Sequence, residues 1–354
     1  MCQSKLHELL TALPKVEQHL HIEGTLEPSL LFSLAAKNNI SLPSNDVDPV
    51  YQTTQTLLAR YQRFTSLDDF LHYYYLGMSV LITADDFETL AWQYFTKAAG
   101  QNVRHAEVFF DPQAHISRGV PYDVVVEGLL AAKKRARDEL ALTVEYIVCI
   151  LRHLPLPDSE ALVDTVLSRG HFADGTLAGF GMVSSEKDFP PHLFREIYAR
   201  VGATGTRLTS HVGEEVGPEF VREALAQLNV ERVDHGLASA RDADLLKQLA
   251  ASETLLTFCP WSNVVLCNLP RLEDAPVRVF LDARVRFSLN SDDPAYFGAY
   301  IQDVFCKVQD TFDLSVADWE WIVGGAIEAS WCGQDRKLAL RTELDAVLAS
   351  FAAA

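Results

Sequence analysis

The hydrophobic and polar residues of segment 15–24, KVEQHLHIEG, alternate with the period of two that is typical of a β-strand. Residues two apart in a strand point to the same face, so we expect His19 and His21 to lie side by side. Gly24 should then let the chain turn away. Two imidazoles aimed at one point can bind one transition metal. Two ordinary core or surface histidines would show the same pattern, so this pair alone leaves both interpretations open.

Seven further segments are short and rich in β-branched or aromatic residues, as strands are. They are residues 103–110, 142–151, 177–183, 207–212, 230–236, 253–260 and 285–290. Helical patterns lie between them and from residue 299 onward, and Thr83 and Asp86 have the spacing of a capping pair. Eight strands alternating with helices predict one α/β domain over residues 1–354, closed into a (β/α)8 barrel of the TIM type. An open doubly wound sheet is the alternative, although no GxGxxG follows any strand.

The stretch between the first two strands is long enough to add structure outside the barrel. Residues 26–44 have a helical pattern, residues 45–63 are polar and weakly patterned, and Ser66 with Asp69 resembles another capping pair. We therefore expect extra N-terminal helices and a helical lid over about residues 40–80 that could cover a site. Packing between helices explains most of the aromatic side chains here, which are Phe64, Phe70, Tyr73, Tyr74 and Tyr75.

Composition narrows the classes of function. The chain has 354 residues, of which 48% are hydrophobic, enough for a large core. Its 30 Lys and Arg face 48 Asp and Glu, a net charge of −18 that disfavours a nucleic-acid partner but allows a neutral small substrate. Six cysteines show no CxxC, so we expect mostly reduced core cysteines. The N-terminal segment lacks a signal-peptide pattern, and no apolar run suits a membrane helix, which favours a cytoplasmic protein.

Chemically reactive residues gather where the predicted strands end. In a TIM-type barrel, catalytic groups lie at the C-terminal ends of the strands. Four strands end in such groups, which are His19, His21 and Glu23; His211, Glu214 and Glu215; Asp234 and His235; and Asp292 and Asp293. Each group has an ordinary explanation, such as a helix cap, a core imidazole or a solvated loop. Four coincidences at one face of one barrel are hard to explain in that way.

The residue types at these strand ends suit metal-assisted hydrolysis. His19, His21, His211 and Asp292 offer three nitrogens and one oxygen, a donor set that zinc prefers. Zinc can lower the pKa of a water molecule to about 7 and so create a nucleophile. Nearby, Glu214 could serve as general acid or base and His235 could orient or deprotonate the water. Asp293 could accept a hydrogen bond from a substrate N–H.

The motifs HLHIEG, HVGEE, DHG and SLNSDDP, in this order, resemble those of the adenosine/adenine deaminase family of the amidohydrolase superfamily. The resemblance runs from about residue 13 to residue 300. It implies one zinc ion per chain, bound by the four ligands named above. It also implies that Glu214 protonates purine N1, that His235 acts on the attacking water and that Asp293 contacts N7. Hydroxide would add at C6, ammonia would leave, and a 6-oxopurine would form.

Details within the motifs resemble the branch of the family that acts on the free base. Glu23 stands where nucleoside deaminases have Asp, and its longer side chain would leave less room for a ribose. The segments 183–186 and 291–300 are similar to those of the same branch, and the resemblance places Ser184 near N3. It therefore implies conversion of adenine to hypoxanthine, as in purine salvage. Val183 and Val212 depart from the usual residues, so N6-substituted adenines or adenosine remain alternative substrates.

Four other interpretations compete. A two-metal amidohydrolase usually needs a bridging lysine at the end of the fourth strand, and Lys187 lies beyond that end. The HxE and PCxxC pattern of other zinc deaminases does not match Cys259-Pro260-Trp261-Ser262. A non-catalytic purine-binding protein would usually have lost a ligand or Glu214, and all are present. An RNA-editing deaminase conflicts with the acidic charge.

Overall fold

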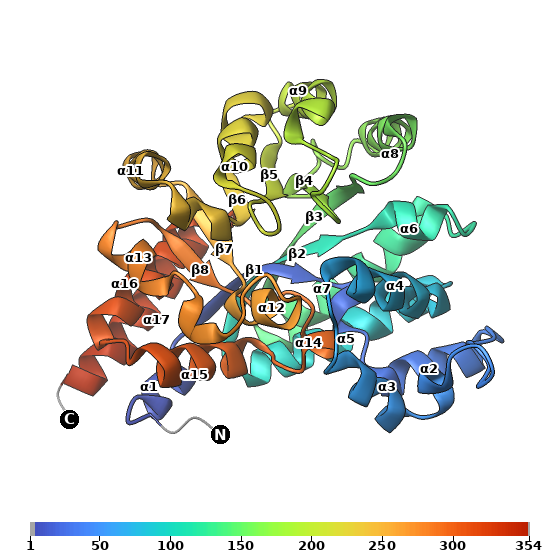
Figure 1. Cartoon of the computed structure of the whole chain (residues 1–354), viewed down its shortest axis with the longest axis horizontal. Coiled ribbons are helices and arrows are strands. Elements are labelled where there is room, and N and C mark those ends of the chain that lie inside the picture. The colour runs from blue at the N-terminus through green and yellow to red at the C-terminus, as the bar shows by residue number, and fades with distance from the viewer. Residues whose placement is uncertain (1–3, 353–354) are drawn as a thin grey trace.

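The computed structural model describes residues 4–352, and eight parallel strands form its centre. Each strand is hydrogen-bonded to the next in chain order (Figure 1). The strands are β1 (Lys15–His21), β2 (Val103–Phe110), β3 (Thr143–Leu151), β4 (Gly179–Val183), β5 (Arg207–Val212), β6 (Arg232–His235), β7 (Leu255–Phe258) and β8 (Phe287–Leu289).

The sheet closes where the segment after β8 meets β1. A parallel bridge joins Leu20 to Asp292. The N–H of His21 donates to the carbonyl of Asp292 at 3.1 Å, and the N–H of Asp292 donates to the carbonyl of His19 at 3.2 Å. The predicted (β/α)8 barrel is therefore confirmed. Three candidate metal ligands, His19, His21 and Asp292, take part in the hydrogen bonds that close it.

Strand β1 is buried along its whole length. Its alternation therefore separates two buried faces, as expected for a strand with the barrel interior on one side and helices on the other. Neighbouring elements accept hydrogen bonds from Gln18 in this strand. Its Nε2 donates to the carbonyl of Ala326 at 3.1 Å, and its N–H donates to Asn290 at 2.8 Å.

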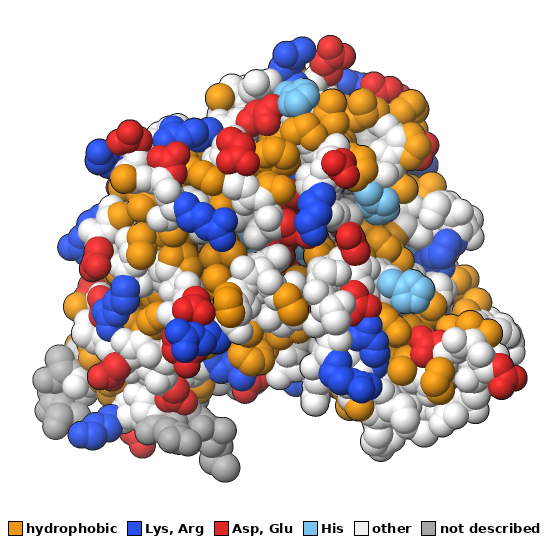
Figure 2. Space-filling model, viewed as in Figure 1, with side chains coloured by type: hydrophobic (Ala, Val, Ile, Leu, Met, Phe, Trp, Pro, Cys, Tyr) orange, Lys and Arg blue, Asp and Glu red, His pale blue; other side chains and the backbone are white. Residues whose placement is uncertain are grey.

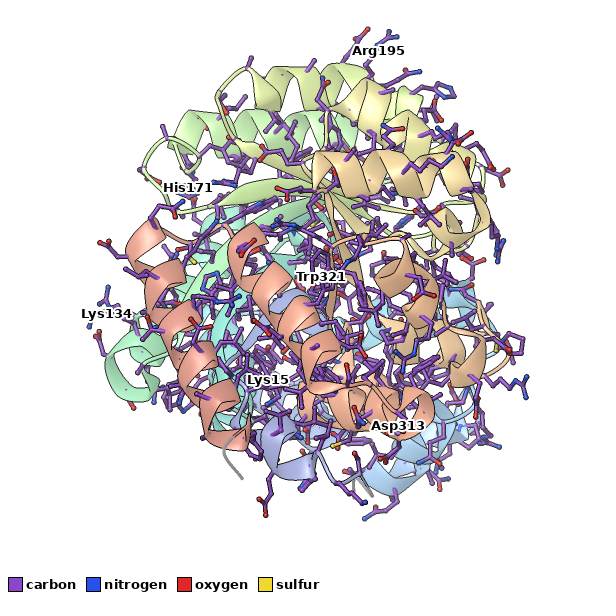
Figure 3. The ribbon with its side chains drawn as sticks, turned by 90° about the vertical axis from the view of Figure 1, so that its left-hand side faces the viewer. Lys15, Lys134, His171, Arg195, Asp313 and Trp321 are labelled. Atoms are coloured by element: carbon purple, nitrogen blue, oxygen red, sulfur yellow. The ribbon has the colours of Figure 1, made fainter. Side chains whose placement is uncertain are left out.

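Helices surround the strands on the outside (Figure 1). The helices that connect consecutive strands include α5 (Ala84–Gly100), α7 (Tyr122–Leu140), α8 (Leu156–Arg169), α9 (Arg195–Gly202), α10 (Pro218–Glu223), α11 (Ala243–Ser252) and α13 (Val277–Asp282). After β8 follow α14 (Pro294–Phe297), α15 (Ile301–Phe312), α16 (Val316–Ala329) and α17 (Gln334–Ala352), and α1 (His7–Ala12) precedes β1. Figure 3 shows α16, which carries Trp321, running beside α17 along the outside of the barrel.

Between β1 and β2 the chain forms α2 (Pro28–Lys37), α3 (Thr54–Tyr61) and α4 (Leu67–Gly77). The predicted cap is present, since Ser66 Oγ accepts the N–H of Asp69 at 3.1 Å at the start of α4. Helix α2 is shorter than expected from its pattern, and α3 lies in the polar, weakly patterned part of the predicted helical lid. A capping box between Thr53 and Thr56 begins α3, which supplies the start signal that hydrophobic periodicity lacks.

Several predicted boundaries agree with the structure, and the shortest elements differ from the prediction. β2, α7 and β5 match residue for residue. The short helices α6 (Pro112–Ile116), α12 (Pro260–Val265) and α13 were not predicted. The first two begin with proline directly after a strand and span fewer than two turns, which is too short for a periodic pattern to show.

The cysteines correct one expectation. Cys149 and Cys259 are buried, but Cys267 is exposed and Cys306 and Cys332 are partly buried, so most of the described cysteines are not core residues. All five are free thiols, as expected, and Cys2 lies outside the described residues.

On the face of the molecule that Figure 2 shows, basic and acidic side chains are interspersed with hydrophobic ones. No helix in the described part of the chain is both long and apolar enough to cross a membrane.

Candidate active site

Three histidines and one aspartate converge at the C-terminal face of the barrel. His19 and His21 come from β1, His211 from β5, and Asp292 from the turn after β8. Nε2 of His21 lies 3.0 Å from Nε2 of His211 and 3.4 Å from Oδ1 of Asp292. Nε2 of His19 lies 3.4 Å from the same oxygen. All four side chains are buried. The ligand atoms of His19, His21 and His211 lie within 4.8 Å of one another, and those of His19 and of His21 also cluster with that of Asp292.

These separations fit a tetrahedral metal ion. Zinc binds such nitrogens and oxygens at about 2.0–2.2 Å, which places two ligand atoms of a tetrahedral site about 3.3–3.5 Å apart. Nε2 of His19 is buried and has no hydrogen-bond partner among the described residues. A cation at the convergence point would satisfy this lone pair and those of His21 and His211. The donor set therefore fits zinc.

A chain of hydrogen bonds behind the cluster fixes the tautomer of His19. Thr257 Oγ1 donates to Asp234 Oδ1 at 2.9 Å, so toward Nδ1 of His19, also at 2.9 Å, it can only accept. The ring proton of His19 therefore lies on Nδ1, and Nε2 presents its lone pair to the cluster. Asp234 also lies 3.5 Å from Nδ1 of His211, which makes no hydrogen bond among the described residues.

Burial and mutual charge keep the ligand set in its metal-binding form. Burial lowers the pKa of His21 to about 3 and that of His211 well below its usual value. Burial acts to raise the pKa of Asp292, but the neighbouring histidines, with His19 foremost, outweigh it and hold that pKa below its usual range. Neutral imidazoles and an ionised carboxylate are the forms that bind a metal.

Three of the predicted site residues have a left-handed backbone. Their φ values are +64° at Asp292, +63° at His235 and +82° at Ser184. Residues with a side chain adopt this region rarely, and such strain gathers at functional sites.

Glu214 is a buried acid beside the cluster. Its Oε2 lies 3.5 Å from Nε2 of His235, and its Oε1 accepts from Nδ2 of Asn268 at 3.2 Å. Glu186 accepts the N–H groups of Gly213 and Glu214 at 3.0 and 2.8 Å and so holds this loop. Burial raises the pKa of Glu214 well above its usual range, and nearby carboxylates raise it further. The raised pKa favours the protonated form of Glu214, which can donate its proton.

His235 lies between Glu214 and the ligand set, with Nε2 3.9 Å from Oδ2 of Asp292. Burial lowers the pKa of His235 well below its usual value. The neutral ring can accept a proton from a molecule held at the cluster.

Asp293 lines the pocket above the cluster, and its Oδ1 has no partner among the described residues. Burial, followed by the charge of Asp292, raises the pKa of Asp293 well above its usual range. Gly24 makes room for it, since a Cβ on Gly24 would lie 1.9 Å from Oδ1 of Asp293. The chain does turn at Gly24, in a 3-10 turn over Glu23–Thr25, but its φ is not positive, and close approach to Asp293 is what requires glycine here.

Comparison with known proteins agrees with this geometry. The family model for adenosine deaminase matches residues 14–347. The chain belongs to the adenosine deaminase family. An adenine deaminase from Gibberella zeae is 69% identical over 99% of both chains. The crystal structure of an adenine deaminase from Arthrobacter aurescens has a TM-score of 0.89 at 36% identity and covers 97% of this chain and 100% of its own.

A third relative shares the fold. An amidohydrolase from Burkholderia ambifaria, solved with bound Zn, has a TM-score of 0.82 at 24% identity, with 100% of this chain and 98% of that one covered. The resemblance drawn from the four motifs is confirmed by the family match, and the roles of individual residues stay predictions.

In this member of the adenosine deaminase family, the pocket over the cluster has a cavity volume of about 40 Å³. Side chains of α4 close one side, and the strand ends form the floor. The lining residues are His21, Leu67, Phe70, Leu71, Tyr74, Tyr75, Asp111, Val183, Ser184, His211, Glu214, His235, Leu266, Asp292 and Asp293. Phe70, Tyr74 and Tyr75 therefore do more than pack α4, whereas Phe64 and Tyr73 are not part of this lining.

Glu23 lies outside this lining, although we predicted that it shapes the substrate site. It is fully buried, and its Oε1 accepts the N–H of Asp111 at 3.0 Å and lies 3.0 Å from Nε2 of His115. Burial raises the pKa of Glu23 to about 7. Any effect of Glu23 on the pocket is thus transmitted through Asp111, and its predicted influence on ribose binding stays a prediction.

Ser184 does line the pocket. Its Oγ lies 2.7 Å from Nδ1 of His153 and accepts from Tyr75 Oη at 3.5 Å. Of the two valines that depart from the family pattern, Val183 lines the pocket, whereas Val212 lies in the hydrophobic core.

Sequence reasoning missed Asp111, Tyr74, Asn268 and Glu186. Asp111 was visible only as the end of a strand before proline. Lys187 lies where it was expected, away from the ligand set, and pairs with Glu215 at 2.7 Å.

Proposed function

We propose that this chain is a hydrolytic deaminase that converts adenine to hypoxanthine and ammonia in cytoplasmic purine salvage, with one zinc ion held by His19, His21, His211 and Asp292. The observation that carries the proposal is the clustering of these ligand atoms beside the buried acid Glu214, whose pKa burial raises. The 69% identity to an adenine deaminase over nearly the whole chain supports the choice of substrate.

When bound, zinc supplies Lewis-acid chemistry that makes a water molecule nucleophilic near neutral pH. The protein groups perform the remaining steps. His235 accepts a proton from the attacking water, whose oxygen bonds to C6 of the purine, and Glu214 gives its proton to N1. Asp293, whose raised pKa favours the protonated form, donates a hydrogen bond to N7. The bond from C6 to the amino nitrogen then breaks, and that nitrogen leaves as ammonia with a proton returned by the site.

The test measures amine release and metal content on one sample. Purified protein is incubated with adenine, adenosine and N6-methyladenine, and zinc per chain is determined alongside. We expect about one zinc per chain and ammonia release that is fastest with adenine. Removal of zinc by a chelator should abolish turnover, and added zinc should restore it.

Other results would change the proposal. Faster turnover of N6-methyladenine would keep the reaction and change its substrate, and faster turnover of adenosine would contradict the role of Glu23. No turnover of any of the three with zinc bound would favour a purine-binding protein. Two zinc ions per chain would contradict the single-metal site.

A further inference from the structure

Asp111 is a buried acid in the pocket that the mechanism above does not use. Its side chain is 1% exposed and lines the pocket. One oxygen, Oδ2, accepts the hydroxyl of Tyr74 at 3.3 Å. The other, Oδ1, is buried and has no hydrogen-bond partner among the described residues. A buried polar atom without a partner is costly, so an unpaired acceptor in a pocket points to a ligand donor.

Two neighbours hold Asp111 in place. Glu23 Oε1 accepts its backbone N–H at 3.0 Å, and Pro112 directly after it begins α6. Together with the Tyr74 hydroxyl, these contacts fix both the backbone and one carboxyl oxygen. Oδ1 is therefore the free hydrogen-bonding position of this side chain.

Several polar groups that line the pocket with Glu214 contact one another. Ser184 Oγ accepts from Tyr75 Oη at 3.5 Å, the rings of Tyr75 and Tyr74 lie 5.5 Å apart, and the hydroxyl of Tyr74 donates to Asp111. Asp293 completes the circuit, close enough to Asp111 for the charge of Asp111 to raise the pKa of Asp293.

Around a purine, starting from N1 on the six-membered ring, the nitrogens follow as N3, N9 and N7. If N1 faces Glu214 and N7 faces Asp293, as the proposed function requires, N9 faces the sector that holds Asp111. In free adenine N9 carries a hydrogen, and in a nucleoside it carries the sugar.

We propose that Oδ1 of Asp111 accepts the N9–H of the unsubstituted base, and that Glu23 is a positioning residue that holds Asp111. This inference rests on the proposed function for the orientation of the purine. A carboxyl oxygen can accept this hydrogen bond whether or not the group carries a proton. A purine with a substituent on N9 leaves Asp111 unpaired, and sites built around such a hydrogen bond reject the analogue that lacks it by about 10⁴-fold.

The experiment compares adenine with 9-methyladenine, which lacks the N9–H, in the zinc-loaded full-length protein. In the wild type we expect kcat/KM for adenine to exceed that for 9-methyladenine by about 10⁴-fold. Asp111→Asn and Asp111→Ala should each reduce this ratio by at least about 100-fold, with the loss on adenine falling mainly on KM. In the asparagine variant the hydroxyl of Tyr74 engages the amide oxygen, so the pocket receives an N–H donor in place of an acceptor.

Asp68→Asn is the matched control. Asp68 is exposed beside α4 and is also near Ser184, so this variant removes a carboxylate without touching Asp111. Its ratio should remain that of the wild type. Glu23→Gln keeps an oxygen that can accept the N–H of Asp111, so it should keep most of the wild-type ratio of kcat/KM between adenine and 9-methyladenine. Glu23→Leu should lose this ratio through a change in KM.

Equal losses on both substrates in the Asp111 variants would show a merely structural role and overturn the inference. An unchanged ratio would overturn it as well. Equilibrium binding of purine and 9-methylpurine, measured by calorimetry, separates this inference from the proposed function. If the wild type binds purine preferentially and Asp111→Asn abolishes that preference, the inference holds even where adenine is not deaminated.

Discussion

Two groups of buried acids lie in the same barrel, and their partners differ. In the first, Glu107 of β2 lies 2.5 Å from Nη2 of Arg232 at the start of β6 and 3.1 Å from Nε2 of His105. It also accepts the backbone N–H of Trp331, which follows α16. Burial acts to raise the pKa of Glu107, but the charge of Arg232 outweighs it and lowers that pKa to about 2. Glu107 is thus ionised and paired at neutral pH.

The second group, at the C-terminal ends of the strands, consists of Glu214, Asp293 and Asp111. They are as buried as Glu107, and across residues 4–352 no lysine or arginine forms an ion pair with any of them. Arg152 lies nearby, but its guanidinium donates to the carbonyl of His211. Burial therefore raises the pKa of all three acids well above the usual range.

The difference shows that the partner, and not burial, decides what a buried acid does. Glu107 ties β2, β6 and the C-terminal helices together. The unpaired acids keep protons and lone pairs available to a ligand, at a cost in stability that pairing would have offset. Changes in the first group should therefore affect folding, and changes in the second should affect turnover.

The largest effect is expected for Glu214→Gln. This substitution removes the proton donor and should lower kcat for adenine by about 10²–10⁴-fold. Zinc content should be unchanged, because Glu214 is not in the ligand set, and the thermal midpoint should not fall. Steady-state kinetics, metal analysis and calorimetry on one sample check this. Near-normal kcat would contradict the assigned role.

Arg232→Met should remove the buried ion pair of Glu107 in the first group. Leaving Glu107 buried without its charge partner should lower the free energy of unfolding by about 3–5 kcal/mol, whereas kcat of the protein that remains folded should be near that of the wild type. Chemical denaturation and kinetics below the transition measure both. Arg137→Met in α7 is the matched control, because the ion pair of Arg137 with Asp138 is exposed and should leave stability almost unchanged. Equal changes in the free energy of unfolding for Arg232→Met and Arg137→Met would contradict the role given to the buried ion pair.

Gly24→Ala tests the second group through its geometry. The added methyl would displace Asp293, and a shift of about 1 Å at a reacting centre can lower kcat/KM by about 100-fold. Gly325→Ala in α16 is the control, since nothing lies within 4 Å of its added Cβ and alanine favours a helix. Full activity of Gly24→Ala would show that Asp293 does not need its present position.

The pH dependence of the free energy of unfolding should reflect the titration of Glu107, the acid of the first group. The pKa of Glu107 is about 2 in the folded protein and about 4.3 in an unfolded chain, so its contribution is fully present above about pH 4.5 and is lost as pH falls toward 2. The wild type should therefore lose about 2 kcal/mol more than Glu107→Gln over that range. Parallel melting curves from pH 5 to pH 2.5 check this, and a constant difference between them would contradict the lowered pKa.

The clustering of the proposed metal ligands was predictable because the C-terminal end of each parallel strand can be recognised in the sequence. His19, His21, His211 and Asp292 each end or follow a segment with a clear strand pattern, and parallel strands bring such ends to one face. Glu214 and His235 were found for the same reason. The order of strands in the chain was thus enough to bring these residues together.

The other side of the pocket was not predictable in this way. Asp111 and Asn268 carry no pattern of their own, and their importance depends on which atoms remain unpaired after packing. The shortest helices were missed because fewer than two turns show no periodicity. The close approach of Gly24 to Asp293 was missed because it leaves no trace in the local sequence.

The hydrogen bonds that close the barrel have a consequence for biosynthesis. The bond between Glu17 and Ser291 joins residues 274 positions apart, next to the ligands on either side of the seam. At about 5–20 residues per second, a ribosome would need roughly 15–55 s to make the chain between them. Throughout that time the nascent protein contains His19 and His21 but still lacks Asp292, the aspartate of the proposed metal site. A chain released early could therefore hold most of the barrel and still lack a complete metal site.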